Sequence, residues 1–404
     1  MEKTSPSLES KVMKVMESSF FFLSLPFFIM GLLLPVYGKE LGASALEIGV
    51  IFSAFSVMTI LMRPLVGWAL DRFGRRPFYV SGMLGYALTM LAFAYSDQVW
   101  GMAAARLLQG ASSACAWLSA SAIIADISGL ENRAHLFGRQ TQASSRGSIL
   151  GAFIAFTIFN IDAGSNGSGE GLTGWQLSFF VFAAGALIAA WIALRGMPET
   201  NPQRAHTKPS PITWSRAWTL LMLVTLVTAA AWTMTSPILI LFLTERLHAD
   251  VGAIGWAFLP SGLIWALLPS HLGRLADRFG RKPLMALGLA VSAGTMFVLP
   301  ALDSILGLAA LWAVLALCFA AGDPAEEALV ADLTGNDQRG RAYGLYVMAS
   351  DIGAALGPLG GGWLYDAASP AAPFRVTGAI LALSALVLLA FLKIPQPAQT
   401  EAGA

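Results

Sequence analysis

The sequence predicts an all-α integral membrane protein with twelve transmembrane helices, arranged as two six-helix bundles. Its 404 residues are 56% hydrophobic and only 12% charged, whereas soluble domains are typically about 45–50% apolar and about 25% charged. Long apolar runs recur along the chain, and the second half repeats the pattern of the first. So few charges cannot cover the two or three soluble domains that this length would otherwise form.

The apolar runs have the length of membrane spans, since a helix needs about 20 mostly apolar residues to cross a bilayer. None of them alternates polar and apolar residues as the strands of a membrane barrel do. The first run is longer than a signal-peptide core of about 7–15 residues, so we expect it to be retained as a helix. The expected spans lie near residues 18–38, 45–69, 77–95, 99–125, 136–160, 173–195, 216–244, 252–272, 283–301, 305–331, 341–366 and 372–393.

The distribution of Lys and Arg predicts the orientation, because cytoplasmic loops carry an excess of these residues. With the N-terminus inside, the cytoplasmic segments hold 19 of them and the outer loops hold 3. We therefore expect a multi-pass protein of the inner (plasma) membrane with both termini in the cytoplasm.

An internal repeat divides the chain into two halves. A shift of 206 positions aligns the chain with itself without a gap from about residue 41 to residue 151. Repeats in the same orientation predict two bundles related by an axis along the membrane normal. The expected parts are an N-tail (1–17), a first bundle (18–195), a proline-rich cytoplasmic linker (196–215), a second bundle (216–393) and a C-tail (394–404).

A charged loop motif occurs once in each half. The sequence GWALDRFGRR at 67–76 follows the second expected span, and GRLADRFGRK at 273–282 follows the eighth. On these two copies the chain resembles the major facilitator superfamily, and the resemblance covers nearly all of its length. It implies the fold of that superfamily and a transporter that works by alternating access.

The resemblance also implies a role for the two loops, since such clusters hold the cytoplasmic side shut in the outward-open state of the superfamily. Their glycines permit close helix approach and tight turns, and their charges can form ion pairs. A loop that only set the topology would need the arginines but not the carboxylates. The expected latch residues are Gly67, Asp71, Arg72, Gly74, Arg75 and Asp126, and in the second half Gly273, Asp277, Arg278, Gly280, Arg281 and Asp332.

The fourth span contains RLLQG at 106–110, which resembles a motif associated with proton transfer in proton-coupled members of the superfamily. Helical spacing places Arg106, Gln109 and Trp117 on one face. A charged residue inside a span normally faces the bundle interior or a water-filled cavity. The alternative is that Arg106 extends to the outer membrane surface.

The eleventh span carries the glycine and proline spacing that the superfamily's antiporters usually have in the fifth. Gly353, Gly357 and Pro358 are its central residues. We expect close packing of this helix against a neighbour; the motif supports antiport only weakly.

Three acids in the tenth span, Asp323, Glu326 and Glu327, share one helix face. In the superfamily this helix lines the central cavity, so the acids predict a site for a coupling proton or a cationic substrate. The alternative is a structural network with cytoplasmic arginines. Arg146 in the fifth span is expected either to bind an anionic group or to pair with one of these acids.

Arg63 in the second span and Asp351 in the eleventh lie at similar expected depths. Those two helices face each other in the superfamily, so the resemblance suggests a gating pair that forms when the cytoplasmic side closes. Reversing both charges should then restore transport that each single reversal removes.

The sequence lacks the residues that several other classes of function require. The sequence has no GxxxxGK(S/T) phosphate loop, its four histidines have no metal-ligand spacing, and no serine lies in a nucleophile elbow. A net charge of +1 gives no basis for nucleic-acid binding. We therefore expect that the protein is not an enzyme and binds no metal or cofactor, and that a proton gradient drives it. We also expect a monomer that is surrounded by membrane lipids.

Together these features predict a secondary active transporter that exports small amphiphilic compounds, driven by protons. The first alternative is a proton-coupled symporter or a uniporter for a small polar or anionic metabolite, with Arg63, Arg106 and Arg146 helping to bind the anion. A lipid or glycolipid flippase and a non-transporting receptor or assembly factor are further alternatives.

Overall fold

A computed structural model describes residues 6–128, 133–164, 173–200, 214–249, 251–267, 281–332 and 339–392. The regular structure in these ranges is helical throughout, which confirms the predicted all-α class. The chain divides into two compact units, Met1–His206 and Thr207–Ala404. The division falls within residues 196–215, where the sequence predicts the linker.

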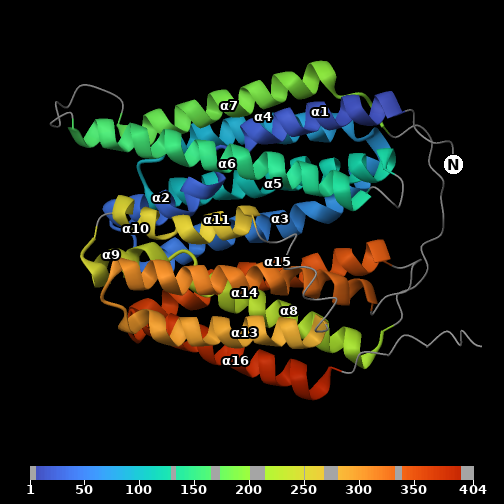
Figure 1. The fold of residues 1–404 in the computed structure, drawn as a ribbon. Helices are drawn as coiled ribbons and strands as arrows, with labels where there is room; N and C mark the ends of the chain where they lie inside the picture. Colours follow the sequence, from blue (N-terminus) through green and yellow to red (C-terminus); the bar gives the residue numbers. More distant parts are fainter. Residues whose placement is uncertain are drawn as a thin grey trace, which may run out of the picture. The chain divides into compact units, whose positions relative to one another are not determined.

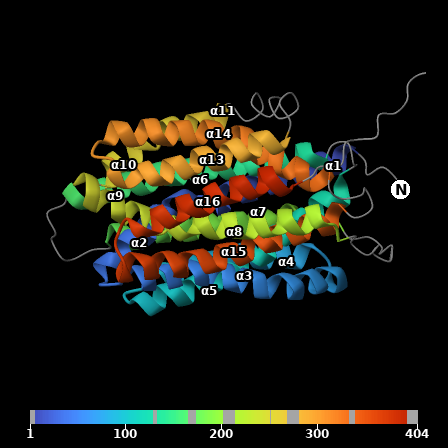
Figure 2. The same ribbon diagram turned by 90° about the horizontal axis from the view of Figure 1, so that it is seen from below.

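Within each unit the helices run side by side along one common direction (Figures 1 and 2). The first unit contains α1 (Pro6–Leu23), α2 (Phe27–Glu40), α3 (Ala45–Phe73), α4 (Arg76–Ala94), α5 (Val99–Ile127), α6 (Arg133–Gly164) and α7 (Gly174–Gly196). The second contains α8 (Arg216–Thr235), α9 (Leu239–Leu247), α10 (Val251–Ala257), α11 (Leu259–Leu267), α13 (Arg281–Val298), the short η1 (Leu299–Ala301), α14 (Ile305–Asp332), α15 (Arg339–Ala367) and α16 (Ala372–Phe391).

Eight segments of the described chain are long and apolar enough to cross a membrane, and two shorter apolar stretches, Ala253–Ile264 and Ile305–Cys318, accompany them. These segments agree with a protein that crosses the membrane many times. The count of twelve spans stays a prediction.

Three of the expected spans are interrupted helices. The first breaks between α1 and α2, the seventh between α8 and α9, and the eighth at Phe258. Proline explains the positions, because it has no N–H to donate and its ring clashes with the carbonyl four residues earlier. Pro26 and Pro237 lie within the first two breaks, and Pro260 lies two residues after the third, as the second residue of α11.

The first helix also begins well before residue 18, at Pro6. Val12, Met13 and Met16 are fully buried in this early part of α1. Their spacing places them on one face of a helix, so this stretch packs against the core of the first unit although it is less apolar than the span that follows.

The same pairs of helices meet in both units. In the first unit α1 packs on α6 and α7, and α4 packs on α5 and α7. In the second unit α8 packs on α15 and α16, and α13 packs on α14 and α16. The 206-residue shift aligns α4 with α13, α5 with α14 and the first part of α6 with α15, and the other helices follow in the same chain order, so the sequence repeat corresponds to a repeated packing scheme.

Glycines allow the closest of these contacts. A methyl group added at Gly147 of α6 would collide with the backbone carbonyl of Phe21 in α1, and one at Gly151 with that of Leu25 just after α1; one at Gly353 or Gly357 of α15 would collide with the backbone of α8. Each pair therefore brings two helix backbones closer together than any residue with a Cβ atom would permit. Pro358 lies buried inside α15 next to this contact.

Candidate functional site

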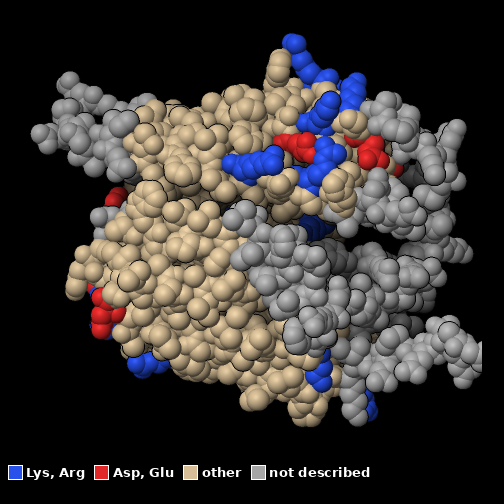
Figure 3. Space-filling view, in the orientation of Figure 1, with Lys and Arg blue, Asp and Glu red and all other residues tan. Residues whose placement is uncertain are grey.

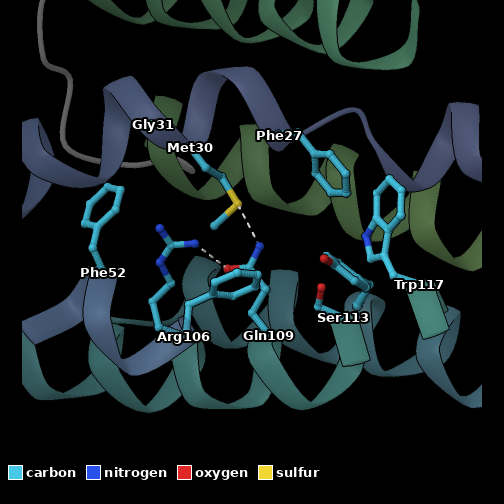
Figure 4. A pocket seen from close by; sticks show the side chains of 10 residues that line it. Phe27, Met30, Gly31, Phe52, Arg106, Gln109, Ser113 and Trp117 are labelled. Atoms are coloured by element: carbon cyan, nitrogen blue, oxygen red, sulfur yellow. Dashed lines mark hydrogen bonds between the residues drawn. The ribbon is translucent and has the colours of Figure 1, made fainter. Parts of the chain in front are cut away.

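The first unit contains a cavity of about 260 Å³ whose walls come from α2, α3, α4 and α5. Figure 4 shows that the polar side chains of α5 point toward Met30 and Phe27 on α2. The lining residues are Phe27, Met30, Gly31, Phe52, Phe55, Tyr86, Arg106, Gln109, Ser113 and Trp117. Half of the lining residues are thus aromatic, and Arg106, Gln109 and Ser113 add polar groups along one helix.

Arg106 is held inside this cavity and is only 8% exposed. Its Nη1 donates a hydrogen bond of 2.7 Å to Gln109 Oε1. The Arg106 Cζ lies 4.5 Å from the ring centroid of Phe52 and 5.4 Å from that of Phe55, which is cation–π geometry. The guanidinium is therefore directed into the unit, not toward the outer membrane surface.

Gln109 connects the arginine to the opposite wall, because its Nε2 donates to Met30 Sδ at 3.4 Å. Trp117 closes the other end. Its ring centroid lies 4.8 Å from that of Phe20, in an edge-to-face arrangement, and 6.2 Å from that of Phe27. These side chains come together because their spacing along α5 keeps Arg106, Gln109 and Trp117 on one face, as the sequence indicates.

Arg146, by contrast, is exposed on α6 and is not part of the cavity lining. Arg63 on α3 and Asp351 on α15 are both half-buried. They belong to different units, and their pairing stays a prediction.

Among the acids of the tenth span, Glu326 is the one whose side chain the structure describes. Its Oε1 accepts a hydrogen bond of 3.0 Å from Thr225 Oγ1, which joins α14 to α8. Asp323 and Glu327 lie on α14, but their side chains are outside the described set.

The first copy of the loop motif forms an ion-pair cluster around Arg75. Its Nη1 lies 2.9 Å from Asp71 Oδ1, and its Nε lies 3.2 Å from Asp126 Oδ2. Gly74 turns the chain between α3 and α4 with a φ of 96°, a conformation that glycine adopts without strain. The cluster therefore connects the ends of α3, α4 and α5.

The other two motif residues of this copy have different surroundings. The Arg72 guanidinium lies over the ring of Trp68 at 5.4 Å and belongs to none of the described ion pairs. A Cβ added at Gly67 would lie 3.8 Å from Leu118 Cδ2, an ordinary van der Waals contact between α3 and α5. On the face shown in Figure 3, most charged side chains of this unit gather over the right-hand part.

Two residues that the sequence reasoning missed complete the cluster. Glu199 accepts hydrogen bonds from the backbone N–H groups of Arg75 at 2.8 Å and Arg76 at 3.2 Å. Thr200 Oγ1 donates to Asp126 Oδ2 at 3.1 Å. A carboxylate is favoured at the N-terminus of a helix such as α4. The signal was an acid directly after the sixth span, but nothing in its spacing identified a partner.

The second copy of the motif is not described at the same level. Gly273, Asp277, Arg278 and Gly280 lie outside the described residues, and the side chains of Arg281 and Asp332, at the ends of α13 and α14, also lie outside the described set.

Comparison with known proteins gives relatives over most of the chain. Multidrug resistance protein 1 of Bacillus subtilis is 25% identical over 354 residues, covering 85% of this chain and 88% of the relative. The class H tetracycline resistance protein of Pasteurella multocida is 23% identical over 366 residues, covering 83% of this chain and 85% of the relative.

Among solved structures, a bacterial homologue of the human lysosomal transporter Spinster, in an inward-facing and occupied conformation, is similar in fold. It has a TM-score of 0.77 at 15% identity and covers 96% of this chain and 97% of its own. A family model described as Major Facilitator Superfamily matches residues 18–222 and 221–404. The chain therefore belongs to the Major Facilitator Superfamily, and it is a multi-pass membrane transporter and not an enzyme.

Proposed function

We propose that this chain is a secondary active transporter that exports small amphiphilic compounds in exchange for protons. The observation that carries the proposal is the cavity of the first unit, where aromatic rings surround a few polar groups. This composition is typical of small-molecule sites. The relatives named for multidrug and tetracycline resistance support export as the direction.

The acids of α14 are the proposed coupling site. Glu326 is half-buried and accepts a hydrogen bond from the hydroxyl of Thr225. Asp323 and Glu327 lie within one helical turn of it. An acid that binds a proton in one conformation and releases it in the other couples transport to the proton gradient, without a further cofactor.

The cluster around Arg75 is the proposed cytoplasmic latch of the first unit. Its ion pairs with Asp71 and Asp126, together with Glu199 on the backbone of α4, tie three helix ends together. Alternating access requires such contacts to form in one state and open in the other. In this proposal the protein is a monomer in the plasma membrane, surrounded by lipid, with both termini in the cytoplasm.

Transport into liposomes tests the proposal. The purified full-length chain is reconstituted, the lumen is made acidic, and uptake of radiolabelled tetracycline is followed, with protein-free liposomes correcting for passive accumulation. Protein-dependent uptake that a protonophore abolishes is the expected result. Uptake that the gradient does not accelerate contradicts proton coupling, and flux of substrate together with protons contradicts export.

A symporter for an anionic metabolite is the second candidate, because Arg106 places a buried cation in the cavity. In the same liposomes this function requires substrate flux in the direction of proton flux. The sign of the coupled flux therefore separates the two candidates.

A further inference from the structure

The cavity of the first unit has two chemically different ends. Arg106 and Gln109 occupy one end, and Trp117 with Phe27 occupies the other. Ser113 lies between them on the same face of α5, about 10 Å along the helix from Arg106. The charged group lies at one end, the hydroxyl of Ser113 lies nearer Trp117, and aromatic carbon forms much of the remaining wall (Figure 4).

The charge of Arg106 is not neutralised by any described residue. Arg75, Arg139 and Arg246 each lie within ion-pair distance of a carboxylate, at 2.9, 2.6 and 2.6 Å. Arg106 is more buried than the side chains of these three, yet within the described ranges its contacts are an amide oxygen and two aromatic rings. A buried cation without an anionic partner is costly to maintain.

The guanidinium has more N–H donors than the described residues satisfy. Nη1 is bonded to Gln109, but the buried Nε has no hydrogen-bond acceptor among the described residues. Arginine presents its N–H groups in a planar fork that matches the two oxygens of a carboxylate. The missing partner is therefore an acceptor with negative charge.

The volume limits the size of that partner. At about 260 Å³ the cavity lies just below the range of about 300–1,000 Å³ for drug-sized ligands. Aromatic walls favour planar rings that can stack or meet them edge to face. The ligand that satisfies all of these features is small, planar and negatively charged at one end.

We infer that this cavity binds small aromatic compounds that carry an oxyanion, a carboxylate or an ionised phenol, with the oxyanion on Arg106 and the ring against the aromatic side chains that line the cavity. This names the substrate class of the exporter and rests on the proposed function for its transport role. Binding itself is independent of the direction and coupling of transport.

Three probes with the same ring system test the inference: 2-naphthoate, 2-naphthalenemethanol and 2-naphthylmethylammonium. At about pH 7 the first is an anion and the last is a cation. Equilibrium dialysis against the purified full-length chain in detergent gives each Kd, with protein-free detergent as the blank. We expect the anion to bind most tightly and the cation least.

Variants locate the effect. Arg106→Gln should weaken naphthoate binding by about 10- to 100-fold, the usual weight of a charge-assisted hydrogen bond, and should change binding of the neutral alcohol by less than about threefold. Arg195→Gln is the matched control, because Arg195 is exposed on α7 with its Cζ 4.8 Å from the ring centroid of Trp191, outside the cavity. It should leave all three constants unchanged.

Two results would overturn the inference: a wild-type protein that binds the ammonium probe as tightly as naphthoate, or an Arg106→Gln variant that keeps the full preference for the anion. The wild-type ranking needs no variant, so it stands even if Arg106→Gln fails to fold. If naphthoate binds as expected but liposomes show no coupled flux, the proposed function fails and the binding site does not. If coupled flux of tetracycline is found without anion preference, the reverse holds.

Discussion

Positions 206 residues apart show that the two units use one packing scheme for different chemistry. In the first unit, the ring centroid of Phe52 lies 4.5 Å from the Cζ of Arg106. At the corresponding positions of the second unit, Phe258 meets Trp312 edge to face, with ring centroids 5.2 Å apart. The phenylalanine is present in both units, whereas an indole takes the place of the cation.

The two units differ again between α5 and α14, eleven residues after Arg106 and its counterpart Trp312. Trp117 lines the cavity on α5, and its counterpart on α14 is Asp323. Ala120 likewise corresponds to Glu326. The repeat thus keeps the glycines where helices touch and the charges of the loop motif, and it changes the charged positions inside the fourth and tenth spans. We expect substrate binding to depend most on the first unit and proton coupling on the second.

The largest expected effect breaks the coupling side of this comparison. Glu326→Gln keeps an oxygen that can accept the hydrogen bond from Thr225, but the amide cannot bind and release a proton. The pH-driven uptake of tetracycline in liposomes should therefore fall to the protein-free level. Thr225→Val removes the donor, leaves the carboxylate and should retain coupled uptake. If neutralising Asp323, Glu326, Glu327 and Asp351 one at a time leaves coupled uptake intact in every variant, the coupling site is not among these acids.

The next largest effect is expected when the first unit is given the residue that the second unit has at the corresponding position. Arg106→Trp gives the first unit the residue of the second, which removes the guanidinium donors while an aromatic partner for Phe52 remains. Coupled uptake should fall by about 10- to 100-fold, and the midpoint of thermal unfolding should hold. A variant that transports at the wild-type rate would show that the cation is not needed in the cavity.

A smaller effect tests what the units share. Gly147→Ala and Gly353→Ala each push a methyl group into the backbone of a neighbouring helix, and overpacking of this kind costs about 1–3 kcal/mol. Gly138 and Gly344 are the matched controls, because an added Cβ at either position meets nothing within 4 Å. Thermal unfolding should show a lower Tm for both test variants and not for the controls. An effect in only one unit would mean that the two contacts are not equivalent.

The smallest effect concerns the latch. Arg75→Gln breaks ion pairs with one exposed and one half-buried carboxylate, for which about 0.2–1 kcal/mol is typical. The fraction of protein open to the cytoplasm, measured by labelling of an engineered cysteine, should rise by up to about fivefold. Arg281→Gln should do the same if the second unit has an equivalent latch. Labelling that is unchanged in both variants would leave these loops with a role in topology alone.

The sequence predicted the parts of the fold that depend on local spacing. Apolar runs indicated the helices, and the 3.6-residue period placed Arg106, Gln109 and Trp117 on one face. Spacing could not show which face of a helix points inward. Arg146 was therefore expected in the cavity, whereas the structure places it on an exposed face of α6. Nor could it find Glu199, whose partners lie more than 120 residues earlier in the chain. Such contacts depend on how distant segments pack together, and they leave no periodic pattern in a single sequence.

The break between α1 and α2 determines how the cavity wall is attached. Phe27, Met30 and Gly31 all belong to α2, and this helix joins α1 through a turn at residues 24–26, where Ser24 N–H donates to Phe20 and Phe27 N–H donates to Ser24. A change in the tilt of α2 would disturb not only this turn but also the hydrogen bond from Phe28 N–H to Ser148 Oγ of α6 and the stacking of Tyr37 on Trp175 of α7. The position of this wall is therefore set by α6 and α7 as well as by the turn, so substitutions in helices that do not line the cavity can still change its outline.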